Sequence, residues 1–573
     1  MGTISAEKKS SGTYYVYRES YRVKINPKDT GKGKGSGKSK VRTRSVYLGT
    51  AETILKSVEQ NKEPLKVNTR RFGLVGAAYQ TAVEMGLQEV LEKHIPGKRG
   101  GIPQWIYFLV SIINRVDNAT SKNKMSQWLA RTILPELLSV DPSKFTGKNF
   151  WYAADSIISE KEYREATDEL GSQDGPMMAL QEDRYTDIEK DLFRRIDSLM
   201  GLSPSAICYD TTNFYTYIEE PTRSELANTC RSKASKHHLR HVGLLMAVEK
   251  NHGVPLVSQI YSANRHDSRV FSSILADLVV VLKDLCGSDS DLIVVLDKGN
   301  NSEDNFTAMN GAISWVGSLV PSHHGELIDL DLSAYHGTWK DYRYYRCTKT
   351  VMGVDCSLVL TYNPATKRKQ QHSLKRGIER LKRDMRAKWA GYKTEHSTLT
   401  SGLLSMKQKS RYGSCFECSV EQGRLDFQEN TDEIHKREKR FGKSVIFSNM
   451  LEAEAGFLID TYHEKNIIED DFRILKDNAI IRFHPIRHWT DTKIRAYALC
   501  CVAALSLMRV MQWKAENAGY KMSPQLLKDE LSDIREVIMV YSRKRATRMI
   551  SNRSMVQNKL WKEFKLDEIE QIL

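Results

Sequence analysis

Two short, apolar runs in this sequence each lead directly into an aspartate. Ala206–Tyr209 precedes Asp210, and Leu292–Leu296 precedes Asp297. Runs of this length without a charged residue are typical of strands that are buried on both faces of a sheet. Further strand patterns and one helical pattern lie between the two runs, at 242–248, 254–260 and 268–286. The order of these patterns predicts a mixed α/β sheet with flanking helices.

Length and composition restrict the possible partners and the compartment. The chain has 573 residues, too many for one hydrophobic core, so several domains are expected. Its 86 Lys and Arg exceed its 71 Asp and Glu, and the net charge of +15 favours binding to phosphate backbones or acidic membranes. The longest apolar run, 496–508, is shorter than the roughly 20 residues that span a bilayer, so we interpret it as a buried helix. Nine cysteines without a regular spacing indicate reduced thiols in the cytosol.

A third group of polar residues follows at helical spacing. Tyr462, Lys465, Glu469 and Lys476 have offsets of 0, 3, 7 and 14 residues, which places them within about 60° on one face of a helix. By itself, such a face is also typical of a solvated ion-pair surface. Opposite two aspartates at strand ends, its carboxylate can complete a site for a hard cation, and its lysines can bind phosphate.

These four residues resemble the signature of bacterial insertion-sequence transposases of the DDE type. The family pattern Tyr-x2-Arg-x3-Glu-x6-Lys matches Tyr462, Lys465, Glu469 and Lys476, with a lysine in place of the arginine. Lysine keeps the charge but lacks the planar fork with which arginine binds phosphate. The resemblance implies an RNase H-like catalytic core.

The two aspartates match the family in the same order. Asp210 stands at the first family aspartate, in Tyr-Asp-Thr-Thr, and Asp297 stands at the second, followed by Gly299 and Asn305. The resemblance implies that Asp210, Asp297 and Glu469 are the catalytic residues and hold two Mg²⁺ ions, for which Mn²⁺ can substitute. Its substrates would be the terminal inverted repeats of a mobile element and the target DNA, joined in a synaptic complex by a homodimer.

Five residues are candidates for DNA binding. Lys465 and Lys476 are expected to bind phosphates beside the cut, and Tyr462 to stack on or hydrogen-bond to the DNA end. Lys236 lies in a basic turn that is expected to face phosphate. Trp489 is a candidate wedge against an unstacked base, although packing in a core is the commoner role of such a tryptophan.

A basic helical pattern over 367–393 has two open interpretations. It carries eleven Lys or Arg against only two acids. A run of this kind is typical of a solvated helix face, and equally of a contact with a nucleic acid.

The expected fold is an α/β RNase H-like core, a mixed five-stranded sheet with flanking helices, interrupted by a mainly β insertion. N-terminal β and helical DNA-binding regions precede the core. The predicted regions are an N-terminal β element with a basic loop (1–70), a helical DNA-end-binding region (71–200), the first part of the core (201–330), the insertion (331–456), the second part of the core with the catalytic Glu helix (457–512) and a C-terminal helical region (513–573).

Two other functions compete with the transposase hypothesis. A two-metal RNase H-like nuclease would cut DNA without joining it, and a domesticated DNA-binding protein would do neither. The large insertion favours an element-specific enzyme over a minimal nuclease, and the presence of all three acids argues against a purely binding role. We expect a cytoplasmic, nucleoid-associated bacterial protein without a membrane partner.

Overall fold

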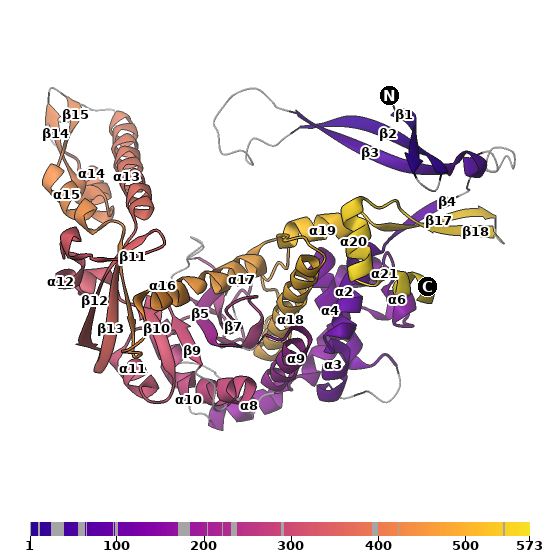
Figure 1. Cartoon of the computed structure of the whole chain (residues 1–573), viewed down its shortest axis with the longest axis horizontal. Coiled ribbons are helices and arrows are strands. Elements are labelled where there is room, and N and C mark those ends of the chain that lie inside the picture. Colours follow the sequence, from indigo (N-terminus) through magenta and orange to yellow (C-terminus); the bar gives the residue numbers. More distant parts are fainter. Residues whose placement is uncertain are drawn as a thin grey trace. The chain divides into compact units, whose positions relative to one another are not determined.

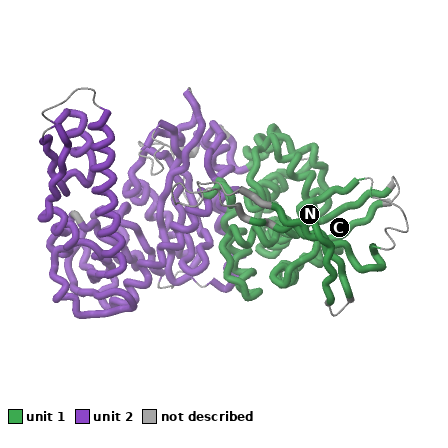
Figure 2. Tube along the Cα trace, turned by 90° about the horizontal axis from the view of Figure 1, so that it is seen from above, with its two compact units in different colours: residues 1–156, 477–482, 503–573 green, residues 157–476, 483–502 purple. Residues whose placement is uncertain are grey.

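The structure is a computed structural model of the whole chain. It describes residues 2–9, 12–24, 39–54, 64, 66–95, 97, 101–169, 184–202, 204–220, 222–230, 238–287, 292–391, 399–421, 423–542 and 545–573. The chain forms two compact units, drawn in different colours in Figure 2. Unit 1 comprises 1–156, 477–482 and 503–573, and unit 2 comprises 157–476 and 483–502. The helix α18 (Asp491–Asn517) contributes residues to both.

The described part of unit 2 is built on a ten-stranded mixed sheet (Figure 1). The strands run in the order β11-β12-β13-β16-β10-β9-β5-β7-β6, and β8 also pairs with β7. Their bounds are β5 (Ala206–Tyr215), β6 (Asn228–Thr229), β7 (Arg240–Glu249), β8 (Pro255–Ser262), β9 (Ile293–Leu296), β10 (Ser314–Ser318), β11 (Gly337–Trp339), β12 (Tyr342–Val351), β13 (Val354–Tyr362) and β16 (Lys443–Ser448). The predicted mixed α/β architecture is therefore confirmed.

Five neighbouring strands at one end of this sheet lie in the order β8-β7-β5-β9-β10. The first three pair antiparallel, whereas β5, β9 and β10 run parallel to one another. Every residue of β8 and β9 is buried, which explains their continuous apolar runs. Gly243 of β7 lies under the ring of Tyr261 of β8, where a Cβ atom would collide with the ring.

The helices of unit 2 follow or interrupt these strands. Those outside the segment between β13 and β16 are α8 (Glu160–Glu169), α9 (Arg184–Met200), α10 (Asp267–Cys286), α11 (Glu303–Met309), α12 (Gly325–Ile328), α16 (Ala455–Glu464) and α17 (Asn466–Lys476). Tyr209 of β5 packs against Phe271 of α10, with ring centroids 4.8 Å apart, so α10 covers one face of the sheet. The helix α17 packs against β5 and β7.

The segment predicted as an insertion, 331–456, forms two structural parts: strands that extend the large sheet and a separate small cluster. Its strands β11, β12, β13 and β16 extend the same sheet that contains β5 and β9. Residues 363–442, between β13 and β16, form a small cluster with its own hydrophobic core. The elements of this cluster are α13 (Pro364–Ala390), α14 (Ser401–Lys409), α15 (Thr431–Arg440) and the hairpin of β14 (Phe416–Glu421) and β15 (Arg424–Glu429).

Unit 1 combines helices with two three-stranded antiparallel sheets in its described residues. One sheet has the order β1-β2-β3, and the other has the order β18-β17-β4. The strands are β1 (Gly2–Lys9), β2 (Gly12–Lys24), β3 (Ser39–Thr50), β4 (Lys66–Arg71), β17 (Arg535–Ser542) and β18 (Arg545–Ile550). The α-helices are α2 (Gly73–Glu84), α3 (Leu87–His94), α4 (Gln104–Asn118), α5 (Met125–Leu129), α6 (Leu134–Leu137), α7 (Gly147–Ala153), α19 (Pro524–Ser532), α20 (Met555–Glu563) and α21 (Leu566–Ile572).

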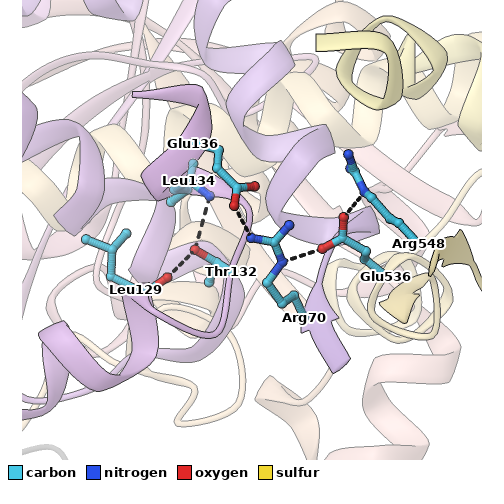
Figure 3. Close-up of polar contacts among 7 residues, drawn as sticks. All are labelled: Arg70, Leu129, Thr132, Leu134, Glu136, Glu536 and Arg548. Atoms are coloured by element: carbon cyan, nitrogen blue, oxygen red, sulfur yellow. Dashed lines mark hydrogen bonds and ion pairs between the residues drawn. The ribbon is translucent and has the colours of Figure 1, made fainter. Parts of the chain in front are cut away.

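A buried carboxylate ties the sheet β18-β17-β4 together (Figure 3). Glu536 on the central strand β17 is fully buried and forms ion pairs with Arg70 of β4 and Arg548 of β18. Arg70 also pairs with Glu136 at 2.5 Å, and half of the Glu136 side chain is exposed. Beside this network, the Thr132 hydroxyl donates to the carbonyl of Leu129 at 2.8 Å.

Three local expectations differ from the structure. Asp210 lies inside β5 and not at the end of a strand, because β5 continues to Tyr215 in its pairing with β7. Of the expected basic loop 31–44, residues 39–44 belong to β3 and the others lie outside the described residues. The C-terminal segment, expected to be helical, contains the strands β17 and β18.

The apolar run 496–508 lies within α18, which is long and apolar enough to cross a membrane by length and composition alone. However, 94% of its most apolar 18-residue stretch is buried inside the protein. This burial agrees with the expectation of a core helix.

Candidate acidic site at the end of the parallel strands

Asp210 and Asp297 lie side by side where the parallel pairing of β5 and β9 ends. Tyr209 and Leu296 are the last paired residues of the two strands, and each aspartate follows immediately. Because both strands run in the same direction, the two aspartates reach the same edge of this strand pair. Both residues were predicted at the end of a strand, although for Asp210 the strand itself continues to Tyr215.

The side chain of Asp210 lies on the face of the sheet that α17 covers. Alternate residues of a strand share a face, so Asp210 shares its face with Thr212 and Phe214. Lys476, the last residue of α17, donates a hydrogen bond to the Thr212 hydroxyl, and its ammonium lies 5.5 Å from the centre of the Phe214 ring. Thr212 and Phe214 on this face therefore contact the helix that carries Glu469.

The predicted helix face is divided between two consecutive helices, α16 and α17, which meet at Lys465. Lys465 itself keeps right-handed helical angles (φ −56°, ψ −17°). Its ammonium donates to Asp297 Oδ1 at 2.9 Å and to Glu469 Oε1 at 3.3 Å. One cation thus brings together two carboxylates from segments that are far apart in the sequence.

The charge of Lys465 dominates the electrostatics of this pair. Burial acts to raise the pKa of Asp297, but the hydrogen bond and charge of Lys465 outweigh it and hold that pKa below its usual range. Burial acts to lower the pKa of Lys465, and the opposing effects of Tyr462, Asp297 and Glu469 raise it above its usual value. Asp297 is therefore an anion and Lys465 a cation at neutral pH.

Tyr462 lies beneath Lys465. The tyrosine is buried at 9% exposure, and the Lys465 ammonium lies 5.3 Å from the centre of its ring. An aromatic face at this distance attracts a cation. Tyr462 is therefore placed to hold Lys465 between the two carboxylates.

Asn305 fixes the loop that follows Asp297. Its side-chain amide is buried and donates to the carbonyls of Asn300, in that loop, and Ser268, at the start of α10. Asp267, the first residue of α10, faces the same loop: a Cβ atom on Gly299 would lie 3.5 Å from its carboxylate. Asn305 and Gly299 were noted only through the family resemblance, and Asp267 was not proposed as a site residue.

The other two DNA-binding candidates are Lys236 and Trp489. Lys236 lies in 231–237, outside the described residues. The side chain of Trp489 is 59% exposed, so it is not a core residue. Thr212, the partner of Lys476, was missed, although its alternation with Asp210 along an apolar strand is a usable signal.

The donor set suits a hard divalent cation. Carboxylate oxygens are the ligands that Mg²⁺ prefers, and two of them already share one cationic group. Among the residues that the structure describes, no three His, Cys, Asp or Glu side chains lie close enough together to hold a metal ion as they stand. The Lys465 ammonium lies between Asp297 and Glu469 and neutralises part of their charge.

Comparisons with known proteins add one distant structural similarity. No family model matches the chain, and neither does any curated protein. Among solved structures, the chain is similar to the cryo-EM structure of a piggyBac transposase synaptic complex with hairpin DNA, at 10% identity and a TM-score of 0.38. The similarity covers 80% of this chain and 77% of that chain. Because it is so distant, the function is inferred below from the residues of the site.

Proposed function

We propose that this protein is a DNA transposase of the DDE type, which cuts DNA at the ends of a mobile element and joins those ends to a target. The observation that carries the proposal is the bridge from Lys465 to Asp297 and Glu469, beside the strand that carries Asp210. It links two of the three acids of the sequence signature, and Asp210 follows the last residue of β5 that pairs with the strand before Asp297.

The topology of the five strands from β8 to β10 supports this proposal. The order β8-β7-β5-β9-β10, with β5, β9 and β10 parallel and β7 antiparallel to β5, is the arrangement that an RNase H-like core requires. In such a core, the first strand and its parallel neighbour each supply an aspartate, and a later helix supplies a glutamate. In this proposal Asp210, Asp297 and Glu469 would take these three positions.

Asp210, Asp297 and Glu469 would hold the metal. Two Mg²⁺ ions, for which Mn²⁺ can substitute, would supply an activated oxygen nucleophile and stabilise charge at the phosphorus. The lowered pKa of Asp297 keeps it an anion at any pH at which such an enzyme works. In the absence of metal, Lys465 would neutralise Asp297 and Glu469.

The lysines of the site have separate roles in this proposal. Lys476 points along the sheet face beyond Asp210 and binds a phosphate near the scissile bond. Lys465, once it leaves the carboxylates, binds a second phosphate, and Tyr462 positions it. The substrates are the terminal inverted repeats and the target DNA, bound by a dimer, and the reaction takes place at the bacterial nucleoid.

The test is a cleavage and strand-transfer assay with Mg²⁺ on duplex DNA that contains the sequences flanking the gene. Asp297→Asn and Glu469→Gln are each expected to lower the rates of both reactions more than about 100-fold. Residues that only hydrogen-bond to metal ligands already contribute about 10- to 100-fold, so a ligand itself should contribute more. The matched control is Asp470→Asn, which changes an acid on the same helix that pairs with Arg473 instead.

Three outcomes separate the hypotheses. Loss of both reactions in the Asp297 and Glu469 variants, with activity kept in the Asp470 variant, supports the proposal. Cleavage without joining in the wild-type protein would assign a nuclease. A wild-type protein that binds these DNA ends without cutting them would leave only a DNA-binding role.

A further inference from the structure

The cluster between β13 and β16 carries most of the excess positive charge of the chain. Residues 363–442 contain 19 Lys and Arg against 10 Asp and Glu, an excess of nine, whereas the whole chain has a net charge of +15. The charge is concentrated on α13, which has ten basic residues and two acids. Neither of the proposed catalytic steps uses this helix.

One face of α13 is fixed by packing. Leu374, Ile378 and Met385 are buried in the core of the cluster, against α14 and the hairpin of β14 and β15. Figure 1 shows α13 standing beside these elements as a single long helix. At Gly377 a Cβ atom would collide with the ring of Tyr412, so the helix backbone lies directly against that ring. The opposite face of α13 is consequently turned to solvent.

Four basic residues form a row along that solvent face. We call Lys369, Arg376, Arg380 and Arg383 the outer row. Their spacings of 7, 4 and 3 residues place them within about 60° around the helix and along about 21 Å of its axis. All four side chains are exposed.

The outer row lacks the acidic partners that basic residues elsewhere in the cluster have. Within the described residues, Lys369, Arg376 and Arg380 form no ion pair or side-chain hydrogen bond, and Arg383 approaches only its exposed neighbour Asp384, at 3.7 Å. By contrast, Lys382 on the flank of the same helix is largely buried and pairs with two glutamates. Arginines one helical turn apart, such as Arg376 and Arg380, repel each other and destabilise a helix.

A polyanion of the right length would relieve this repulsion. Each strand of duplex DNA places one phosphate per about 3.4 Å of axis, so a row of about 21 Å spans roughly six phosphates. Exposed, unpaired Arg and Lys side chains are the groups that neutralise such a backbone. A compact anion would engage only one end of the row.

We propose that the outer row of α13 binds the phosphate backbone of duplex DNA, as a contact separate from the acidic site. This inference rests on the proposed function, since it takes DNA to be the substrate. The contact is independent of base sequence, because the row offers charge and no shaped pocket. It would hold DNA while the acidic site acts on a phosphodiester bond.

The test is the salt dependence of DNA binding by the full chain. Fluorescence anisotropy with a labelled duplex of about 40 base pairs and arbitrary sequence gives Kd between 50 and 300 mM NaCl. For Arg376→Gln/Arg380→Gln, we expect weaker binding at every salt concentration. The slope of log Kd against log[NaCl] should fall by about 2, since each phosphate contact contributes about 0.9.

The matched control is Lys409→Gln/Arg424→Gln. It removes the same charge from two exposed positions on α14 and β15, elements that pack against the buried face of α13. Its slope is expected to stay within about 0.5 of the wild-type value. Thermal unfolding should show that neither double variant is less stable than the wild type.

The possible results either support or overturn the inference. A smaller slope for the outer-row variant alone supports it. Equal slopes for the two double variants overturn it, whether both slopes fall or neither does. A larger loss of affinity for duplex RNA than for duplex DNA of the same length also overturns it. If the wild type binds and cuts DNA while the outer row has no effect, this inference fails and the proposed function stands. If the wild type binds no DNA, both fail.

Discussion

Lys465 determines the charge balance of the acidic site. Without its ammonium, Asp297 and Glu469 would face each other as two anions, which is unfavourable at short distance. A lysine is a compact point charge on a flexible stem, whereas an arginine would hold both carboxylates in a planar fork. A lysine at this position therefore gives the site a counter-ion that can leave easily.

If Lys465 acts as a counter-ion, Lys465→Met should lower the stability of the protein without metal. The same variant should be stabilised more strongly by Mg²⁺ than the wild type is. In EDTA, we expect urea unfolding to show a loss of about 1–2 kcal/mol, between the values for exposed and buried ion pairs. With MgCl2, the variant should gain more in Tm than the wild type, because no ammonium competes for the carboxylates. Lys340→Met is the control, since it removes a lysine that pairs with Asp460 instead. An equal Mg²⁺-induced shift in Lys465→Met and the wild type would refute this role.

Glu189 predicts a pH dependence of stability away from the site. It is buried on α9, and burial raises its pKa to about 8, although hydrogen bonds from the Ser258 amide and hydroxyl act to lower it. In the unfolded chain, its pKa is about 4.3. Between these two values the folded state binds the extra proton, so stability falls as the pH rises from about 4.3 to 8.

The measurement is urea unfolding of the wild type and Glu189→Gln at several pH values. The glutamine cannot ionise, so the stability of the variant relative to the wild type should rise from pH 5 to pH 8 and then level off. A difference that does not change with pH would mean that Glu189 stays ionised in the fold.

At the scale of elements, the buried carboxylate of β17 holds two other strands. Glu536→Gln leaves Arg70 and Arg548 partly buried without their anion, and we expect a loss of about 3–5 kcal/mol. Glu136→Gln removes the exposed partner of the same Arg70 and should cost less than about 1 kcal/mol. Chemical denaturation measures both, and similar losses would show that burial does not control the strength of this network.

Elements with a strong local pattern were predictable from the sequence. The apolar run before Asp297 was predicted as a buried strand, and its parallel neighbour was predicted in the same way. The spacing of Tyr462, Lys465, Glu469 and Lys476 predicted one face of a single helix, whereas the structure divides these residues between α16 and α17 at Lys465. These features depend on periodicity, which a single sequence contains.

Pairing between distant segments was not predictable. The apolar run Val-Ile-Met-Val in β17 is a strand signal, but nothing local predicts that Glu536, the second residue of the strand, is buried between two arginines. In the same way, nothing in the sequence shows that β13 and β16 join the sheet of β5 and β9. The break between α16 and α17 also leaves no proline or glycine as a signal.

At the scale of the whole molecule, the cluster 363–442 enters and leaves the sheet at one point. Tyr362 and Lys443 are paired residues of β13 and β16, and the Asn363 amide donates to the Gly442 carbonyl at 2.8 Å. Removal of 364–441 would join Asn363 directly to Gly442. Asn-Gly is the preferred two-residue loop of a β-hairpin.

We therefore expect the chain without 364–441 to fold, with a hairpin in place of the cluster. Thermal unfolding should retain one cooperative transition for unit 2, and DNA affinity should fall at low salt through the loss of the outer row. Insoluble or unfolded protein would show that the sheet depends on the cluster for its stability.

The shared entry and exit point also has a consequence for the order of folding. Before β13 can pair with β16, the chain between them must form a closed loop, at an entropic cost that grows only with the logarithm of its length. A cluster with its own hydrophobic core can form first and bring its two ends together. The pairing of β13 with β16 then becomes a local contact in kinetic terms. These two strands should therefore pair faster than strands that are joined by an unfolded loop of the same length.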